Sequence, residues 1–204
     1  SSLADRNLIY FSGITLAILT PKGRAKVSQA ISAARTAGAL IAFDPNFREH
    51  LWASREEARD AITAGLACAD IALPTFDDEQ VLFGDSDPGE TAKRIAQSGV
   101  REIVVKNGGY GCLVLDSGLD AGVMIPSKTV AHVLDTTGAG DAFNGAYLAA
   151  RLLEMAPQNS ANIAHVLAAE TVQVFGALMK AETIGTLFSK SFREERSNVG
   201  NGIH

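Results

Sequence analysis

The chain has 204 residues, of which 47% are hydrophobic and 20% are charged, and its formal net charge is −5. This length and composition are typical of one folded domain with a sizeable core rather than of a disordered chain. The negative balance excludes a general attraction to nucleic acid or anionic membranes, so any phosphate binding must be local. No segment has the apolar length of a bilayer-spanning helix, and the first residues show no basic-then-apolar secretion signal. We therefore expect a cytoplasmic protein.

Short apolar runs alternate with amphipathic segments through the first hundred residues. Buried strands are expected at 8–11, 39–43 and 70–73. Helices are expected after Thr20-Pro21, after a capping box at 54–57, from Pro74 to Leu82 and after Asp87. This alternation predicts an α/β fold with a mainly parallel central sheet and helices on both faces.

The second half of the chain continues with strand-like runs at 103–106, 112–115 and 123–125, the first two joined by a hairpin or tight crossover. A long apolar run predicts a buried helix from Ala142 to Met155. A last helix, capped by Asn159 or Ser160, is expected to turn four apolar side chains inward: Ile163, Leu167, Val174 and Leu178. The tail from Lys190 is polar, and we expect it to fray.

A glycine-rich turn, Asp135-Thr-Thr-Gly-Ala-Gly-Asp141, comes directly before the helix expected at 142–155. A helix N-terminus leaves backbone N–H groups unpaired and can bind phosphate there. An acidic side chain at the same terminus repels phosphate, so Asp141 is better placed to accept a proton from the attacking group. The glycines alone would also fit a tight turn without function. The acidic Asp141 and the two threonines, Thr136 and Thr137, favour a phosphate-binding site instead. The pattern indicates phosphoryl transfer to an alcohol.

Two common phosphate-binding motifs are absent from the sequence. It contains no GxxxxGK[ST], and no GxGxxG follows the first expected strand. Ligands of parallel sheets bind at the carboxyl ends of the strands. Residues 44–48, 75–78 and 135–141 can all be placed at that edge.

The stretch D-T-T-G-A-G-D-A-F over Asp135–Phe143 resembles the C-terminal signature of the ribokinase-like (PfkB) carbohydrate kinases. The resemblance implies a ribokinase-like three-layer sandwich over residues 1–204. It makes Asp141 the catalytic base and assigns an anion hole to the backbone of Gly138, Ala139 and Gly140. It places Asp135 near a monovalent cation or the sugar, although a hydrogen-bond acceptor flanking the helix would look the same.

Two further segments, Tyr10–Ala17 and Phe43–Trp52, resemble the 2-keto-3-deoxygluconate kinases of that family. The resemblance implies that Asn46 and Arg48 contact nucleotide phosphates, and the guanidinium fork suits two phosphate oxygens. The alternative for Arg48 is a surface ion pair with Glu49 or Asp44.

The run Lys106-Asn-Gly-Gly-Tyr-Gly111 is similar to the K-x-G-x-x-G nucleotide loop of the family. On that basis Lys106, Gly108 and Gly111 are candidates for ATP binding, because glycines let the backbone approach the nucleotide. A hairpin turn would give the same pattern. His165 stands where the family has Asn near the adenine, so it either borders the base or is an ordinary half-buried helical His.

The family also carries N-x-x-E, which acts on Mg²⁺ and phosphate through water. The equivalent positions here are Thr75 and Asp78, with Glu79 as a neighbouring candidate. A helix-capping Thr followed by solvated acids is the alternative.

The chain starts partway through the family pattern, without the N-terminal strands, the lid and most sugar contacts. The resemblance implies ATP-dependent phosphorylation of a sugar acid, 2-keto-3-deoxygluconate first among candidates, at a primary hydroxyl. It implies ATP and Mg²⁺ as cofactors, with a monovalent cation as a further candidate, and a small-molecule partner rather than nucleic acid or membrane. Two other functions stay open, a non-catalytic nucleotide-binding module and a kinase for another sugar. A homo-oligomer also stays open, as does the question of whether the chain is a fragment of a longer kinase or a natural short form.

Overall fold

The computed structural model describes residue 3 and residues 6–117, 121–176 and 179–200. The chain divides into two compact units, residues 1–107 with 115–122, and residues 108–114 with 123–204. Each unit is described by itself. The single domain expected over 1–204 therefore stays a prediction.

The first unit is built on parallel strands, as the alternation of the sequence predicts. They are β1 (Leu8–Ser12), β2 (Leu40–Asp44), β3 (Ile71–Ala72) and β4 (Glu102–Lys106). Phe11 is paired with Phe43, Ala42 with Ile71, and Ile71 with Glu102. Among the described residues of this unit, these strands neighbour one another in the order β1-β2-β3-β4. This parallel sheet confirms the predicted α/β class.

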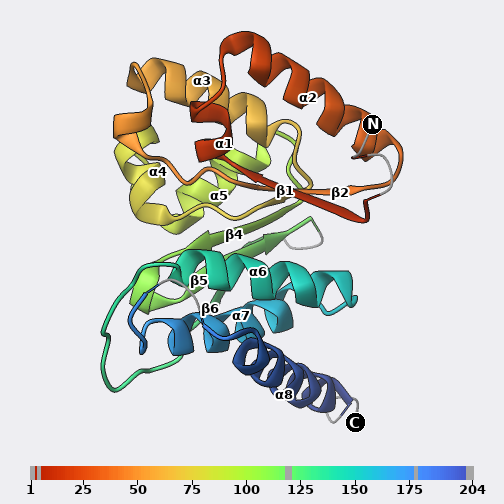
Figure 1. Ribbon diagram of the computed structural model, residues 1–204, viewed down its shortest axis with the longest axis vertical. Helices are drawn as coiled ribbons and strands as arrows, with labels where there is room; N and C mark the ends of the chain where they lie inside the picture. The colour runs from red at the N-terminus through yellow and green to blue at the C-terminus, as the bar shows by residue number, and fades with distance from the viewer. Residues whose placement is uncertain (1–2, 4–5, 118–120, 177–178, 201–204) are drawn as a thin grey trace. The chain divides into compact units, whose positions relative to one another are not determined.

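The helices of the first unit begin where the sequence places caps. They are α1 (Gly13–Ala17), α2 (Pro21–Thr36), α3 (Arg55–Leu66), α4 (Phe76–Phe83) and α5 (Pro88–Ala96), with a 3₁₀ turn at Glu49–Leu51. The side chains of Thr20, Ser54 and Asp87 each accept a backbone N–H from the first turn that follows. In Figure 1, α1, α2 and α3 lie on one side of β1 and β2. The short α1 is an element that the sequence pattern did not predict.

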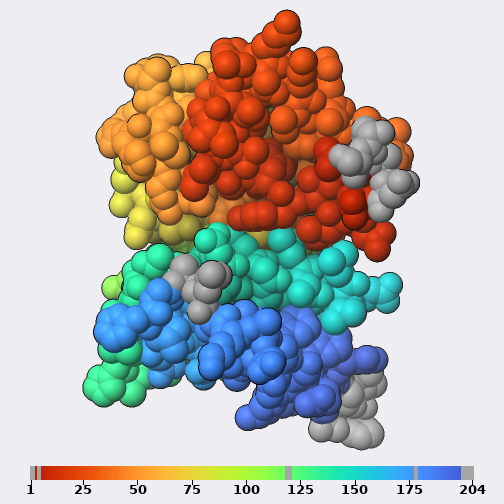
Figure 2. Space-filling model, viewed as in Figure 1, coloured from red at the N-terminus to blue at the C-terminus, as the bar shows by residue number. Residues whose placement is uncertain are grey.

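The second unit holds three helices, α6 (Ala139–Leu152), α7 (Pro157–Thr171) and α8 (Ala181–Gly200), and the strand β6 (Val123–Ile125). Strand β5 (Cys112–Asp116) pairs with β6 in antiparallel fashion. A 3₁₀ turn, Gly108–Tyr110, occupies the loop expected as a hairpin or crossover. Helices α7 and α8 lie side by side in both the ribbon and the space-filling view (Figures 1 and 2). Among the described residues, no helix could cross a bilayer.

Helix α7 is shorter than the apolar pattern predicts, and it begins at Pro157 rather than after Asn159 or Ser160. Ile163 and Leu167 are buried as expected, but Val174 lies beyond the helix end and is 40% exposed. Segment 172–176 hydrogen-bonds instead with residues 134–135, which explains why the helix stops at Thr171. Leu178, also expected inward, lies outside the described residues.

The tail was expected to fray from Lys190, and this prediction was wrong. Helix α8 continues through this stretch to Gly200. Phe188 and Phe192 stack with ring centroids 6.0 Å apart, and Asn159 of α7 donates to a carboxylate oxygen of Glu195 at 2.7 Å. The stacked phenylalanines and the Asn159–Glu195 hydrogen bond thus stabilise a helical segment whose composition is mostly polar.

Candidate functional site

A buried ion pair joins the carboxyl ends of β2 and β4 in the first unit. Lys106 Nζ lies 2.9 Å from Asp44 Oδ2, and the two side chains are only 10% and 4% exposed. The other oxygen, Asp44 Oδ1, accepts the backbone N–H of Asn46 at 3.0 Å. Lys106, predicted from the loop motif, thus lies against Asp44, which sequence reasoning had considered only as a partner for Arg48. The sequence signal that could have indicated this contact is an acidic residue, Asp44, at the last position of a buried strand.

The loop after β2 is held in one conformation by its backbone. Asn46 has a φ of 35°, in the region that few non-glycine residues adopt. A Cβ on Gly13 would lie 1.9 Å from the carbonyl oxygen of Pro45, so only glycine fits between β1 and this loop. The loop therefore presents Asn46 and Arg48 from a rigid base.

Arg48 meets Asp78 rather than the partners considered from the sequence. Its Nη1 donates to the carbonyl of Phe47 at 3.0 Å and lies 3.5 Å from Asp78 Oδ2. Glu49 instead pairs with Arg55 at 2.8 Å. The structure thus brings together Arg48 and Asp78, which two different motifs predicted.

The start of α4 carries the acidic residues expected to act on Mg²⁺. Thr75 is the N-cap residue, but its side chain makes no capping hydrogen bond. Burial raises the pKa of Asp78, while Arg48 lowers it and the nearby Asp44 carboxylate raises it. Glu79, the neighbouring candidate, is fully buried and bonded to Arg94 at 2.7 Å. Within the described residues, no cluster of three or more His, Cys, Asp or Glu side chains could hold a metal by itself.

In the second unit, the glycine-rich turn opens α6. Gly138 is the N-cap residue in a left-handed conformation (φ 78°), and no side chain caps this helix start. Ala139 N–H bonds to Thr136 O at 3.2 Å, and Asp141 lies exposed in the first helical turn. First-turn N–H groups have no partner inside a helix. The turn therefore places one accessible carboxylate beside a helix start that no side chain caps, while the N–H of Ala139, one of the predicted anion-hole groups, is already bonded to Thr136.

Asp135 braces this turn. Its Oδ1 accepts the N–H of Thr137 at 2.9 Å, and its Oδ2 accepts the N–H of Gly176 at 3.1 Å. Bonds from the Thr137 side chain, and then from these two N–H groups, hold the pKa of Asp135 below its usual range. Asp135 thus makes the helix-flanking contacts that were the alternative to a sugar or cation contact.

The two glycines predicted in the nucleotide loop occupy different surroundings. A Cβ on Gly111 would lie 2.1 Å from the carbonyl oxygen of Ile125, so packing against β6 already requires a glycine there. A Cβ on Gly108 would meet no atom within 4 Å, although its φ of 51° is left-handed. Gly108 therefore leaves open space beside the backbone, and Gly111 does not.

His165 on α7 is more buried than the sequence predicts. It is 6% exposed and stands edge-on to Phe143, with ring centroids 5.0 Å apart. Burial lowers its pKa to about 4, although a bond to the Ile125 backbone opposes the shift. The imidazole is neutral at pH 7, and its Nε2 has no hydrogen-bond partner among the described residues.

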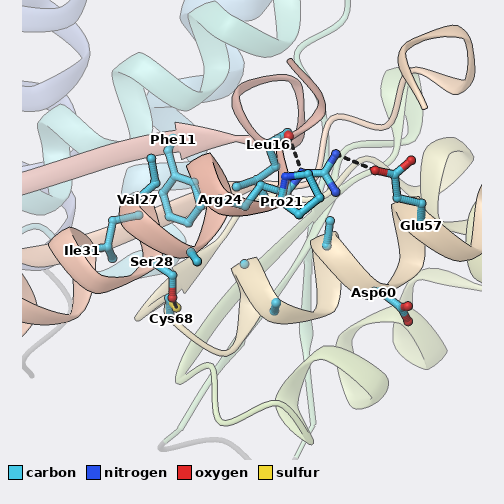
Figure 3. Close-up of a pocket in the computed structure, with 14 residues that line it drawn as sticks. Phe11, Leu16, Pro21, Arg24, Val27, Ser28, Ile31, Glu57, Asp60 and Cys68 are labelled. Atoms are coloured by element: carbon cyan, nitrogen blue, oxygen red, sulfur yellow. Dashed lines mark hydrogen bonds and ion pairs between the residues drawn. The ribbon is translucent and has the colours of Figure 1, made fainter. Parts of the chain in front are cut away.

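A cavity of about 470 Å³ in the first unit lies apart from these residues. It is lined by α1, α2 and α3, and none of the predicted site residues lines it (Figure 3). Arg24 crosses one end, donating to Leu16 O at 2.7 Å and pairing with Glu57 at 2.8 Å (Figure 3). The cavity does not add to the candidate site.

Comparison with known proteins agrees with the motifs. A 2-dehydro-3-deoxygluconokinase from Dickeya dadantii (strain 3937) is 40% identical over 184 residues, which is 89% of this chain and 59% of that protein. A PfkB protein from Polaromonas sp. JS666 superposes with a TM-score of 0.77 at 26% identity, covering 91% of this chain and 58% of that one. An aminoimidazole riboside kinase from Salmonella enterica, solved with its riboside and an ATP analog, has a TM-score of 0.75 at 26% identity, with coverages of 89% and 62%.

The chain therefore spans about three fifths of the length of these relatives. The model of the pfkB family carbohydrate kinases matches residues 1–184. This range includes the glycine-rich turn and the first unit's two ion pairs, Asp44–Lys106 and Arg48–Asp78. The protein belongs to the pfkB family of carbohydrate kinases.

Proposed function

We propose that this chain carries the nucleotide-binding and proton-accepting part of an ATP-dependent sugar-acid kinase, with 2-keto-3-deoxygluconate as the substrate. The observation that carries the proposal is Asp141, an exposed carboxylate in the first turn of an uncapped helix start. The kinase names of the relatives support the reaction, and the 40% identity to a 2-dehydro-3-deoxygluconokinase supports the substrate.

In the proposed reaction Asp141 accepts the proton of a primary hydroxyl as the hydroxyl oxygen attacks the γ-phosphorus. The bond between the γ-phosphorus and the β–γ bridging oxygen breaks, and ADP leaves. The backbone of Gly138, Ala139 and Gly140 stabilises the charge that develops on the transferred group. Arg48 and Asn46 hold nucleotide phosphates, and the open space at Gly108 lets the nucleotide approach the backbone.

Magnesium fits the donors on the first unit. Mg²⁺ is commonly held by one or two carboxylates, with waters and substrate phosphates completing its shell. Asp78 offers one partly exposed carboxylate of this kind, with Thr75 at the start of the same helix. When bound, the ion would neutralise phosphate charge. A monovalent cation near Asp135 is less well supported, because both carboxylate oxygens there already accept N–H groups.

The test is phosphorylation of 2-keto-3-deoxygluconate with ATP, comparing wild type with Asp141→Asn and Asp135→Asn in the complete coding frame. Loss of a general base costs about 10²–10⁴-fold in kcat, so Asp141→Asn should be nearly inactive while still binding ATP. Asp135→Asn should lose stability as well as activity. Full activity of Asp141→Asn would refute the assignment of the base.

A second candidate is a nucleotide-binding module without turnover. The observation that favours it is that Asp135, the candidate for a sugar contact among the described residues, already accepts N–H groups at both carboxylate oxygens. Calorimetry separates the two candidates, because a module binds ATP but neither binds nor phosphorylates sugar. A related kinase with another sugar or nucleoside substrate would share the ATP contacts and differ in the compound that is phosphorylated.

A further inference from the structure

The cavity between α2 and α3 has the size and lining of a small-molecule site, although none of the predicted site residues lines it (Figure 3). Its volume of about 470 Å³ falls within the range of roughly 300–1,000 Å³ that is common for ligand pockets. Its floor consists of buried apolar side chains, Phe11 of β1, Leu16 of α1 and Ile31 of α2. The cavity therefore offers a ligand an apolar surface on which to bury its own apolar atoms.

Small side chains keep the cavity open on both helices. They include Ala25 and Ser28 on α2, and Ala64 and Gly65 on α3. Gly65 cannot be replaced by a larger residue without movement, because a Cβ there would lie 2.8 Å from Cζ of Phe43. Ala25, Ser28 and Ala64 are exposed, so a ligand can enter from solvent.

The charged side chains gather at one end of the cavity. Figure 3 shows Arg24, Glu57 and Asp60 at this end. Arg24 is already engaged, because its Nε donates to Leu16 O at 2.7 Å and its Nη2 pairs with Glu57 at 2.8 Å. Asp60 is exposed and makes no hydrogen bond or ion pair with another residue in the described part of the chain. One guanidinium against two carboxylates leaves this end with one negative charge in excess.

This excess charge decides which kind of ligand fits. A carboxylate or phosphate at this end would be repelled by Asp60, and Arg24 is held by Glu57 and cannot compensate for it. An ammonium group beside Asp60 is attracted, and it leaves the pair Arg24–Glu57 intact. The opposite end, at Ser28 and Cys68, carries no charge that would oppose an apolar group.

We propose that the cavity between α2 and α3 binds an amphipathic amine. Its apolar body lies on Phe11, Leu16 and Ile31, and its ammonium group lies beside Asp60. The site is separate from the proposed kinase chemistry, so its failure would leave the proposed function untouched.

The test is a fluorine NMR titration of the full chain with three probes that share one body. They are para-trifluoromethyl-phenethylamine, the corresponding phenethyl alcohol and para-trifluoromethyl-phenylacetate. The amine should bind most tightly. The alcohol should bind about two- to fivefold more weakly, because an exposed ion pair adds only a small free energy. The phenylacetate should bind weakest of the three.

Trp52 provides a second readout. It is the single tryptophan of the chain, and the guanidinium of Arg24 lies 5.0 Å from its ring centroid. A ligand that reaches the charged end should change the emission of Trp52 along the same titration curve as the fluorine signal.

Two pairs of variants locate the probe. Ala25→Phe fills the cavity from the exposed side of α2 and should remove saturable binding of all three probes. Ala33→Phe makes the same change at an exposed position of α2 outside the cavity, and should bind like wild type. Asp60→Asn should reduce the affinity for the amine to that for the alcohol. Glu56→Gln removes an exposed carboxylate of α3 outside the cavity and should keep the preference.

Three outcomes would overturn the proposal. The first is the absence of saturable binding of any probe to wild type. The second is equal binding of the amine by Ala25→Phe and Ala33→Phe, which would place the probe elsewhere. The third is a phenylacetate affinity equal to that of the amine, which would exclude the class of ligand. Thermal unfolding shows whether Ala25→Phe is folded, and Asp60→Asn tests the site by an exposed change if it is not.

Discussion

Single residues decide how the loop after β2 is held. Gly13 and Pro45 belong to segments that follow neighbouring strands, and the carbonyl of Pro45 occupies the space of the missing Cβ. The Asp44 carboxylate also holds this loop, because it accepts the N–H of Asn46 and binds the ammonium group of Lys106. The position of the candidate phosphate contact Arg48 therefore depends on Gly13 and Asp44, which are not among the candidate contacts themselves.

Gly13→Ala should destabilise the protein and disturb the loop, because its Cβ would lie 1.9 Å from Pro45 O. Overpacking of this kind costs about 1–3 kcal/mol or more. Denaturant unfolding measures the loss. Gly23→Ala is the control, since its Cβ would make only ordinary contacts at 3.4 Å and lies in a helix that gains from alanine. Equal stability of Gly13→Ala and wild type would contradict the packing argument.

Glu79 should make stability depend on pH. Burial raises its pKa from 4.5 to about 7, although Arg94 opposes the shift, so the folded protein retains a proton that the unfolded chain releases. Stability is then fullest below pH 4.5 and falls towards pH 7, by up to about 1.4 kcal/mol per pH unit. Glu79→Gln keeps an acceptor for Arg94 and should flatten this part of the profile. If the free energy of unfolding of Glu79→Gln fell with pH as steeply as that of wild type, the pH dependence would belong to other groups.

At the scale of elements, the features predictable from the sequence were local. Thr20, Ser54 and Asp87 mark helix starts because each cap reaches an N–H only three residues away. The pair Asp44–Lys106 spans 62 residues, and nothing in the local pattern indicates it. Arg48 and Asp78 were each proposed from a family motif, but their contact required the fold. Untested roles, such as the base at Asp141, stay predictions.

Helix α8 shows the same limit, because its polar composition hides an apolar stripe. Leu187, Phe188 and Phe192 are only partly exposed, and Ser191 between them is buried. Composition counts all faces of a helix together, whereas packing depends on one face. The expected fraying failed for this reason.

Limited trypsin digestion tests the packing of α8. Lys180 precedes the helix and should be cut first, while Lys190 and Arg193, inside it, should be protected. Replacing Phe188 and Phe192 by Ala should remove this protection and bring cleavage at Arg193 to the rate at Lys180. Glu194→Ala, an exposed change on the same helix, is the control. Rapid cleavage of the wild type at Arg193 would show that the chain is frayed from Lys190, and would contradict the packing of α8.

For the whole molecule, the decisive fact is that the chain spans about three fifths of its relatives while keeping the glycine-rich turn and the Arg48–Asp78 pair. Nucleotide contacts and sugar contacts should therefore separate in a binding experiment. A ligand that binds only the folded state raises stability by mass action. The same experiment gives opposite results for the two ligands.

Mg·ATP at about a hundred times its dissociation constant should add ~2.7 kcal/mol and raise the unfolding midpoint by roughly 5–10 °C for a chain of this size. The reason is that the candidate phosphate contacts all lie on residues present here. 2-Keto-3-deoxygluconate alone should give no shift, because the resemblance places most sugar contacts in the part of the family pattern that this chain lacks. The Dickeya dadantii 2-dehydro-3-deoxygluconokinase is the positive control for the sugar. A sugar-induced shift in this chain equal to that of the control would show that these residues already form the substrate site.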